Sequence, residues 1–338
     1  MKRRFYSFLA GHLAGYLEFK QKLGYTSFSS PYKAVDFDRY VLFLGVSSIQ
    51  QLDEGFVVHW IHSIPKLTAA TKNIKLQFAR GFFDYLIRVG AAQENPARRI
   101  PWLRARPSTP HVYSLKEIHQ ILDCARRYQS RHPRRLVGST METLVLLLYA
   151  CGLRISEALK LKIQDVDFQE NTLSLWNTKF HKERLVPFSP KVRQRLQGYL
   201  ALRSEFFPPA GAHAPFFCGA TGKACHRIVM YRRFRELLAQ CGLARPRGRR
   251  YPNLHSLRHT FAVHKLYQWY QQGHDILNKL PLLSTFMGHV NIENTQVYLT
   301  ITEALLREGD RRFQGHFETI TAKALKRAQR NSHDDGSR

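Results

Sequence analysis

The chain has 338 residues and a formal net charge of +27 at pH 7. A surplus this large excludes most enzymes of neutral small molecules and favours a polyanionic partner, with nucleic acid first among the candidates. The length suits two domains better than one, and a hydrophobic content of 44% is enough for two cores.

The five cysteines are scattered and odd in number, which argues against a disulfide framework. Cys218 and Cys225 lack the short spacing of a zinc site, so we expect no bound metal. The sequence contains no apolar run long enough to span a membrane, and its N-terminus lacks the apolar stretch of a signal peptide. These patterns predict a cytoplasmic, nucleoid-associated protein with no membrane partner.

Residues 6–90 contain four apolar stripes at helical spacing, around Leu13, Phe37, Trp60 and Phe82. The last stripe stops at Gly90, a common helix end. A small basic helical bundle is the simplest interpretation.

Residues 95–110 combine four prolines with four arginines. Proline breaks helices, so this segment is predicted to be an extended linker. Its arginines could follow a DNA backbone, although an ordinary solvated hinge remains the alternative. The predicted DNA-contacting residues here are Arg98, Arg99, Arg104 and Arg106.

Ser114 and Glu117 have the spacing of a capping box, which predicts that a second domain opens with a helix. An apolar helix over 140–151 should end at Gly152. Residues 171–179 and 184–188 have the pattern of two paired strands, and helices return from residue 191. The predicted fold is therefore mainly α with a small β-hairpin or sheet: an N-terminal helical bundle and a C-terminal mixed helical domain.

Two arginines in this second domain are candidates for holding a phosphate. Arg154 follows Gly152, and Glu157 lies three residues later, where a carboxylate could fix the guanidinium. His255 and Arg258 are spaced to share one helix face, whereas His259 is expected to point elsewhere. Each pattern taken alone is more often a surface charge.

The remaining candidates could move protons or attack. Lys179 ends the first predicted strand, and an unperturbed lysine holds its proton at neutral pH; Lys182 in the turn competes for the same role. His289 follows a glycine at a loop-to-helix junction, and Tyr298 comes nine residues later. Arginine forks hold phosphates, imidazoles move protons and a phenol can attack, so this ordered set favours a tyrosine nucleophile aimed at a phosphodiester.

Four motifs carry a family resemblance: G-L-R-I-S-E-A-L at 152–159, T-K-F-H-K-E-R-L-V-P at 178–187, H-S-L-R-H-T-F-A at 255–262 and M-G-H-V-N-I-E-N-T-Q-V-Y at 287–298. The sequence resembles the tyrosine recombinases of the phage integrase family over roughly residues 1–315. The stretch 299–306 is more similar to transposon-borne members. Met287 stands where the family motif usually has leucine, a volume-conserving change. The resemblance assigns as catalytic residues Arg154, Lys179, His255, Arg258, His289 and the nucleophile Tyr298, with Glu157 in support.

The resemblance implies DNA cleavage and rejoining without metal or cofactor. Tyr298 would attack the scissile phosphate and form a 3′-phosphotyrosyl link that frees a 5′-hydroxyl. Arg154 and Arg258 would stabilise the phosphate charge, and Lys179 would protonate the leaving oxygen. His255 would handle the tyrosine proton, and His289 would hydrogen-bond the phosphate.

The resemblance also implies an organisation: a core-binding domain at 1–104, a linker at 105–112, a catalytic domain at 113–315 and a tail at 316–338. The expected partner is double-stranded DNA. The expected assembly is a homotetramer on two duplexes, or a hetero-oligomer with related recombinases. The expected function is to move or integrate a mobile element. A basic run should add phosphate contacts through Arg245, Arg247, Arg249 and Arg250.

Three alternatives stay open at this stage. A type IB topoisomerase-like enzyme would use similar chemistry to relax DNA. A DNA-binding regulator with a vestigial site would share the fold, although the full catalytic set argues against it. An RNA-binding protein would share the charge but would have no use for Tyr298.

Overall fold

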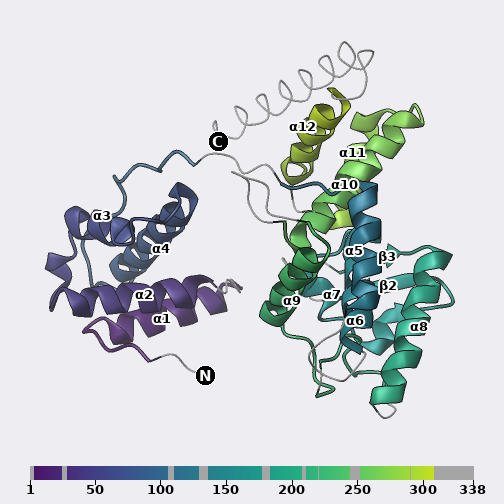
Figure 1. The fold of residues 1–338 in the computed structure, drawn as a ribbon. Coiled ribbons are helices and arrows are strands. Elements are labelled where there is room, and N and C mark those ends of the chain that lie inside the picture. The colour runs from purple at the N-terminus through teal and green to yellow at the C-terminus, as the bar shows by residue number, and fades with distance from the viewer. Residues whose placement is uncertain are drawn as a thin grey trace. The chain divides into compact units, whose positions relative to one another are not determined.

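The computed structural model describes residues 4–24, 29–105, 110–128, 136–176, 183–207, 211–219, 221–243, 252–289 and 291–307. The chain divides into two compact units, Met1–Ser108 and Thr109–Arg338 (Figure 1). Both are built mainly of helices, and the second also contains a small antiparallel sheet. The predicted fold class is confirmed. Among the described residues, no helix is both long and apolar enough to cross a membrane.

The first unit is a helical bundle whose core is largely aromatic. Its elements are α1 (Ala10–Lys22), α2 (Ser29–Phe43), the 3-10 helix η1 (Ile49–Gln51), α3 (Glu54–His62) and α4 (Ala69–Arg88). Asp53 and Thr68 cap α3 and α4 by accepting hydrogen bonds from backbone amides of the first turn. The Phe37 ring meets the Trp60 indole edge-on, with centroids 4.8 Å apart. The four predicted stripes thus become the buried faces of four helices.

The segment that follows α4 is fastened to that helix. The Arg80 guanidinium donates hydrogen bonds to the carbonyls of Ala97 at 3.0 Å and Ile100 at 2.5 Å. The Asn73 side-chain amide pairs with the backbone of Leu103 in both directions, each bond 2.9 Å long. Residues 97–103 are therefore attached to α4, because their backbone polar groups find partners on that helix, while the linker itself stays a prediction.

The second unit is organised around one apolar helix. Its helices are α5 (Leu115–Arg127), α6 (Leu136–Ala150), α7 (Ile155–Ala158), η2 (Ile163–Asp165), α8 (Pro190–Phe206), α9 (Arg227–Gln240), α10 (Leu254–Gln271), α11 (Ile276–Met287) and α12 (Glu293–Arg307). Helix α6 is buried along most of its length because α5, α8 and α10 all pack against it (Figure 1). Ser114 and Glu117 form the predicted capping box at the start of α5.

The sheet has the order β1-β2-β3, with β1 at Val166–Asp167, β2 at Thr172–Leu175 and β3 at Arg184–Pro187. All its pairings are antiparallel, and Leu175 lies opposite Arg184. The predicted strand pair is confirmed over Thr172–Leu175 and Arg184–Pro187, although Trp176 already lies outside the first strand. The two-residue β1 was not predicted because it is too short for an alternating pattern. The register places Arg184 opposite Leu175, at the end of the hairpin where the chain passes from β2 to β3.

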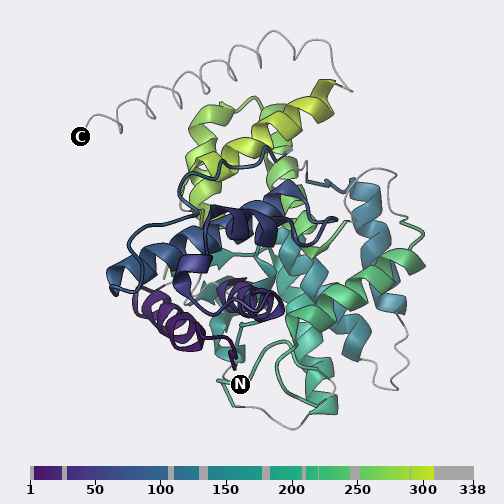
Figure 2. The same ribbon diagram turned by 90° about the vertical axis from the view of Figure 1, so that its left-hand side faces the viewer.

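Helices α10, α11 and α12 enclose a separate apolar core at one end of the second unit (Figure 2). Ala262, Leu283, Met287 and Leu299 are buried in it. Tyr298 belongs to the same cluster, so packing in this core sets the position of its ring relative to α10.

Candidate active site

Arg154 is placed by a glycine-dependent turn. Gly152 ends the preceding helix with a φ of +59°, and a Cβ there would lie 2.5 Å from the Phe261 ring, so glycine is required on both grounds. Arg154 is then the N-cap residue of α7, and its Nη1 donates to Oε1 of Glu157 at 2.7 Å. The predicted pairing of Arg154 with Glu157 is present.

Arg258 lies in the first turns of α10 and is 1% exposed. Its Nη1 donates to the carbonyl of Gly152 at 2.5 Å, and its Nη2 donates to the carbonyl of Met287 at 2.6 Å. Burial and the nearby charge of Arg154 lower the Arg258 pKa to about 9, so the guanidinium keeps its charge at neutral pH.

Arg184 is a site residue that the sequence did not reveal. Its guanidinium donates to both carboxylate oxygens of Glu157, at 3.1 and 2.9 Å. Burial by itself raises the pKa of Glu157, but the hydrogen bonds and charges of Arg184 and Arg154 outweigh it and lower the pKa overall. The sequence did offer one signal, because Arg184 is the first residue of the predicted strand 184–188 and follows the charged residues Lys182 and Glu183.

The C-terminal end of α11 collects all three arginines. Arg154 Nη2 donates to the carbonyl of Gly288 at 2.7 Å, and Arg184 Nε donates to the carbonyl of Phe286 at 3.1 Å. Together with the Arg258 bond to Met287, these contacts satisfy carbonyls that a helix end leaves unpaired, at the negative end of its dipole. Gly288 has a φ of +65°, and a Cβ there would lie 2.6 Å from Arg184 Nη1. The helix end and Glu157 thus hold the arginines in one cluster.

Tyr298 faces this cluster from α12. The residue is 2% exposed, and its hydroxyl forms a 2.9 Å hydrogen bond with Nδ1 of His259. Burial raises the Tyr298 pKa, and the charges of Arg258 and Arg154 offset part of that rise. The expectation that His259 points elsewhere is wrong, because a residue four positions after His255 returns to the same helix face.

Two further histidines belong to the cluster: His289 stacks on the Tyr298 ring, with centroids 6.3 Å apart, and His255 packs against His259. The His255 ring packs edge-on against His259, with centroids 4.5 Å apart. His289 follows Gly288, and its Nδ1 forms a 2.8 Å hydrogen bond with the buried hydroxyl of Thr295. Partial loss of water around the rings, followed by the charges of Arg258 and Arg154, lowers the pKa of both His255 and His289 to about 4, although part of His255 stays exposed to solvent. Thr295, which orients His289, was also missed, although it lies within the last sequence motif.

The structure gathers most of the predicted catalytic residues into one place. They are Arg154, His255, Arg258, His289 and Tyr298, with Glu157 beside them. Lys179 and its competitor Lys182 lie outside the described residues. In the first unit Arg98, Arg99 and Arg104 are exposed. The other predicted DNA-contacting arginines lie outside the described residues: Arg106, Arg245, Arg247, Arg249 and Arg250.

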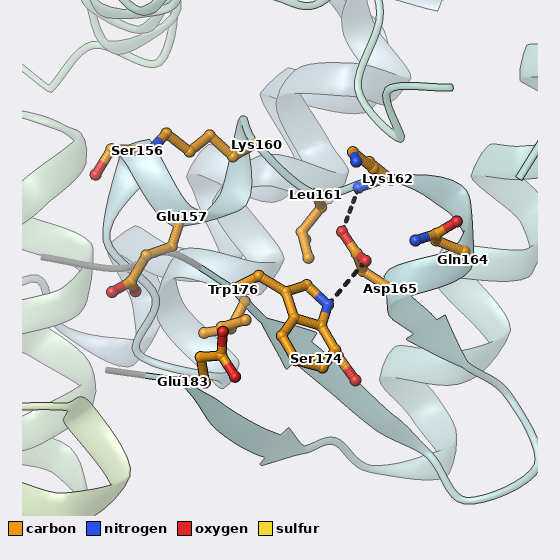
Figure 3. A pocket seen from close by; sticks show the side chains of 11 residues that line it. Ser156, Glu157, Lys160, Leu161, Lys162, Gln164, Asp165, Ser174, Trp176 and Glu183 are labelled. Carbon is orange, nitrogen blue, oxygen red and sulfur yellow. Dashed lines mark hydrogen bonds between the residues drawn. The ribbon is translucent and has the colours of Figure 1, made fainter. Parts of the chain in front are cut away.

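A pocket of about 530 Å³ lies next to the cluster (Figure 3). Glu157 lines one end of it and Gln164 the other, while the Trp176 indole lies between them and donates a hydrogen bond to Asp165 at 3.1 Å. None of the five predicted catalytic residues that the structure describes lines this pocket. Trp176 directly follows β2 and Glu183 directly precedes β3, so the pocket borders that end of the hairpin.

The cluster combines a surplus of positive charge with a protonated phenol and imidazoles that are neutral at pH 7. Three guanidinium groups share a single carboxylate, so an anion placed between them would find uncompensated charge. In the described part of the chain, no group of three or more His, Cys, Asp or Glu side chains is arranged to hold a metal ion. The arrangement suits a phosphate ester with a tyrosine hydroxyl beside it.

Comparison with known proteins agrees with this geometry. The model of the phage integrase family matches residues 112–304, and the chain belongs to this family of tyrosine recombinases. The integrase/recombinase y4rB of Sinorhizobium fredii is 30% identical over 307 residues, which are 90% of this chain and 97% of that protein. The tyrosine recombinase XerD of Caulobacter vibrioides is 30% identical over 235 residues, which are 69% of this chain and 71% of its own.

Solved structures confirm the fold. The integrase of the transposon Tn1549 in complex with transposon right end DNA superposes with a TM-score of 0.63 at 18% identity, covering 85% of this chain and 94% of that one. The XerH site-specific recombinase bound to its difH substrate superposes with a TM-score of 0.60 at 21% identity, covering 82% of this chain and 76% of that one. The family match and the recombinase relatives at 30% identity favour a site-specific recombinase over the topoisomerase-like and vestigial alternatives.

Proposed function

We propose that this recombinase cuts and rejoins double-stranded DNA through a covalent bond between Tyr298 and a 3′-phosphate, and that it moves or integrates a mobile element. The observation that carries the proposal is the buried Tyr298 hydroxyl beside Arg154 and Arg258, whose charges act on the phenol. The relatives named integrase and the DNA-bound transposon integrase of the same fold support the mobile-element part.

In the proposed reaction, the scissile phosphate binds between Arg154 and Arg258. These donors stabilise the additional negative charge on the non-bridging oxygens as the phenol attacks. Glu157 and Arg184 position the cluster, and His289 donates to the phosphate through the ring nitrogen that Thr295 leaves free. Because the phosphotyrosyl ester conserves the energy of the original phosphodiester, strands can be exchanged and rejoined without ATP.

Lys179 is the proposed acid for the leaving 5′ oxygen, in preference to Lys182. Lys179 is the last residue of the strand predicted over 171–179, whereas Lys182 adjoins Glu183, where a solvated ion pair is the easier outcome. A DNA substrate with a 5′-bridging sulfur at the cleaved bond tests the choice, because sulfur leaves without a proton. Lys179→Ala should regain cleavage on that substrate and Arg154→Ala should not; rescue of Lys182→Ala instead would reverse the assignment.

In the proposed DNA interface, arginines of both units contact phosphates of the DNA backbone. The exposed Arg98, Arg99 and Arg104 are well placed for it in the first unit, since their side chains are open to solvent. Such contacts release counterions, so affinity should fall steeply with salt. The triple alanine variant should show a shallower salt dependence than the wild type, and an unchanged slope would remove these arginines from the interface.

The remaining expectations are a tetramer on two duplexes and action on nucleoid DNA in the cytoplasm. Both extend the likeness to recombinases bound to DNA. Mass measurement of the purified protein on its mapped site would test the tetramer.

The central experiment recovers DNA that becomes covalently attached to the protein in expressing cells and maps the attached ends. The wild type should carry DNA joined through a 3′-phosphate at one preferred sequence. Tyr298→Phe should bind the same DNA without forming the adduct. Tyr149→Phe, which removes a tyrosine hydroxyl from the same unit, is the matched control and should form the adduct normally. An undiminished adduct in Tyr298→Phe would remove the proposed nucleophile.

A further inference from the structure

One histidine of the cluster contacts the proposed nucleophile directly and has no role in the family-based assignment. His259 lies on α10, and its Nδ1 is 2.9 Å from the Tyr298 hydroxyl. His255, to which the resemblance assigns the handling of the tyrosine proton, packs edge-on against His259. The histidine that meets the phenolic oxygen is therefore the one better placed to receive its proton.

We propose that His259 is the general base of strand cleavage: it holds the Tyr298 hydroxyl and takes its proton as the phenolic oxygen attacks the phosphate. The inference rests on the proposed function, since it requires Tyr298 to be the nucleophile. The O–H bond of Tyr298 breaks and an Nδ1–H bond forms on His259. The phenolic oxygen uses its electron pair to bond phosphorus, and the P–O5′ bond breaks with its electron pair on the leaving oxygen, which takes a proton from Lys179. Rejoining reverses each transfer.

The protonation states in the DNA-free protein are compatible with this role. Burial, followed by the charges of His255 and Arg258, lowers the His259 pKa to about 3, so the ring is neutral and one nitrogen can accept a proton. Burial raises the pKa of Tyr298, so the phenol keeps its proton and is the natural donor in this bond. The hydrogen bond accordingly runs from Tyr298 to a lone pair on Nδ1, with the His259 ring proton on Nε2.

The same charges make the base responsive to substrate. The titratable and charged groups that face His259 are His255, Arg258, His289 and Tyr298. Among them Arg258 is the permanent cation, and it opposes a second positive charge on the imidazole. A phosphate diester bound to the arginines brings a negative charge that cancels this opposition. Proton transfer to His259 therefore becomes favourable only when DNA occupies the site.

The chain supplies a matched control on the same helix. The Tyr149 hydroxyl forms a 3.0 Å hydrogen bond with Nδ1 of His264, also on α10, and burial raises the tyrosine pKa and lowers the histidine pKa there as well. This second tyrosine–histidine bond resembles the first in chemistry and partial burial, but it lies outside the arginine cluster. His264→Ala thus reports what losing such a bond does to the fold alone.

The experiment follows adduct formation on a duplex taken from the mapped site, with a nick that lets the cleaved fragment diffuse away. His259→Ala should slow adduct formation by about a hundredfold or more, the usual size of a lost general base. His264→Ala should stay within a few-fold of the wild type. His259→Asn retains a polar atom near the Nδ1 position but cannot take a proton, so it should be as slow as His259→Ala. A wild-type rate in His259→Ala, or recovery in His259→Asn, would overturn proton transfer to this residue.

A second measurement separates a proton acceptor from a structural support. Fluorinated tyrosine incorporated at position 298 has a lower phenol pKa and needs less help in losing its proton. In His259→Ala it should raise the rate of adduct formation at least tenfold, whereas in the wild type it should change that rate much less. Absence of rescue would overturn the general-base role. Because wild-type adduct formation is measured in parallel, its absence would instead sink the proposed function and leave the two failures distinguishable.

Discussion

Each of the two units buries a cation almost completely, and the two environments differ in one respect. Lys75 in α4 is 0% exposed, and its Nζ donates to the carbonyl of Trp60 at 2.6 Å and pairs with Asp36 at 3.2 Å. Arg258 in α10 is 1% exposed but shares the single carboxylate of Glu157 with two further arginines. The first unit balances its buried charge, whereas the second leaves positive charge in excess.

This difference separates a structural charge from a functional one. A balanced buried ion pair attracts no further ion, and it can often be replaced by apolar side chains without loss of stability. An unbalanced cluster is destabilised by its own repulsion and improves when an anion enters it. Perturbed groups of this kind gather at sites that do chemistry. The comparison predicts how each unit should respond when its charges are altered.

The largest effect is expected from the arginines of the second unit. Arg154→Ala and Arg258→Ala should each slow adduct formation on the mapped DNA by about 10²–10³-fold, as for loss of a donor to transition-state charge. DNA affinity should remain within about tenfold of the wild type, since binding is spread over many phosphates. Cleavage at nearly the wild-type rate in either variant would reduce that arginine to a structural charge like Lys75.

The next effect concerns the carboxylates. Glu157→Gln leaves three arginines without a counter-ion and should lower the free energy of unfolding by about 3 kcal/mol, in the range of a broken buried pair. Added sulfate should restore much of that loss, because Arg154 remains reachable from solvent. Asp36→Asn is the matched control: its lysine is fully enclosed, so sulfate should stabilise it only as much as it stabilises the wild type. Equal gains in thermal midpoint for both variants would erase the distinction between the units.

Acid should act on the second unit through its half-buried imidazoles. The pKa values of His259 and His289 are lowered from 6.5 to about 3 and about 4. Below pH 6.5 these histidines therefore bind protons in the unfolded chain but not in the folded chain. The free energy of unfolding falls as the pH is lowered, until the pH reaches the pKa of the folded state. Each histidine contributes a slope of up to about 1.4 kcal/mol per pH unit. Denaturant unfolding between pH 7 and 4 should show a shallower loss in His259→Asn, and an identical pH dependence would contradict the lowered pKa.

The smallest effect is expected from Lys75→Met in the first unit. Methionine has a similar length, and the carbonyl of Trp60 keeps a hydrogen bond from the Ser63 hydroxyl at 2.7 Å. Asp36 is partly exposed and can be hydrated once its partner is gone. Stability should change by less than about 1.5 kcal/mol, with adduct formation unaffected. A loss of several kcal/mol would show that the balanced pair is essential to the bundle.

Much of the fold and of the site follows from local patterns. The apolar stripes predicted the helices, and the three-residue spacing of Arg154 and Glu157 predicted their ion pair, because helix geometry fixes which side chains meet. Arg184 could not be found in this way, since Phe286 becomes its neighbour only when α11 packs beside the hairpin. Thr295 lies six residues after His289, a spacing that the three- and four-residue helix rules do not cover. The bonds from Asn73 to Leu103 cross 30 residues and leave no periodic trace. His259 was within reach of a four-residue spacing rule but was assigned to the wrong face.

The end of α11 gives the site a property that single substitutions cannot reveal. Its last carbonyls bind Arg154, Arg184 and Arg258, and Glu157 joins the same arginines from the other side. Residues that share partners in this way lose their interactions together, so the effects of combined substitutions should be far from additive. Arg154→Ala combined with Arg184→Ala should cost much less than the sum of the two single changes. Substitutions at these positions are consequently coupled, and the first substitution in the cluster causes the largest loss.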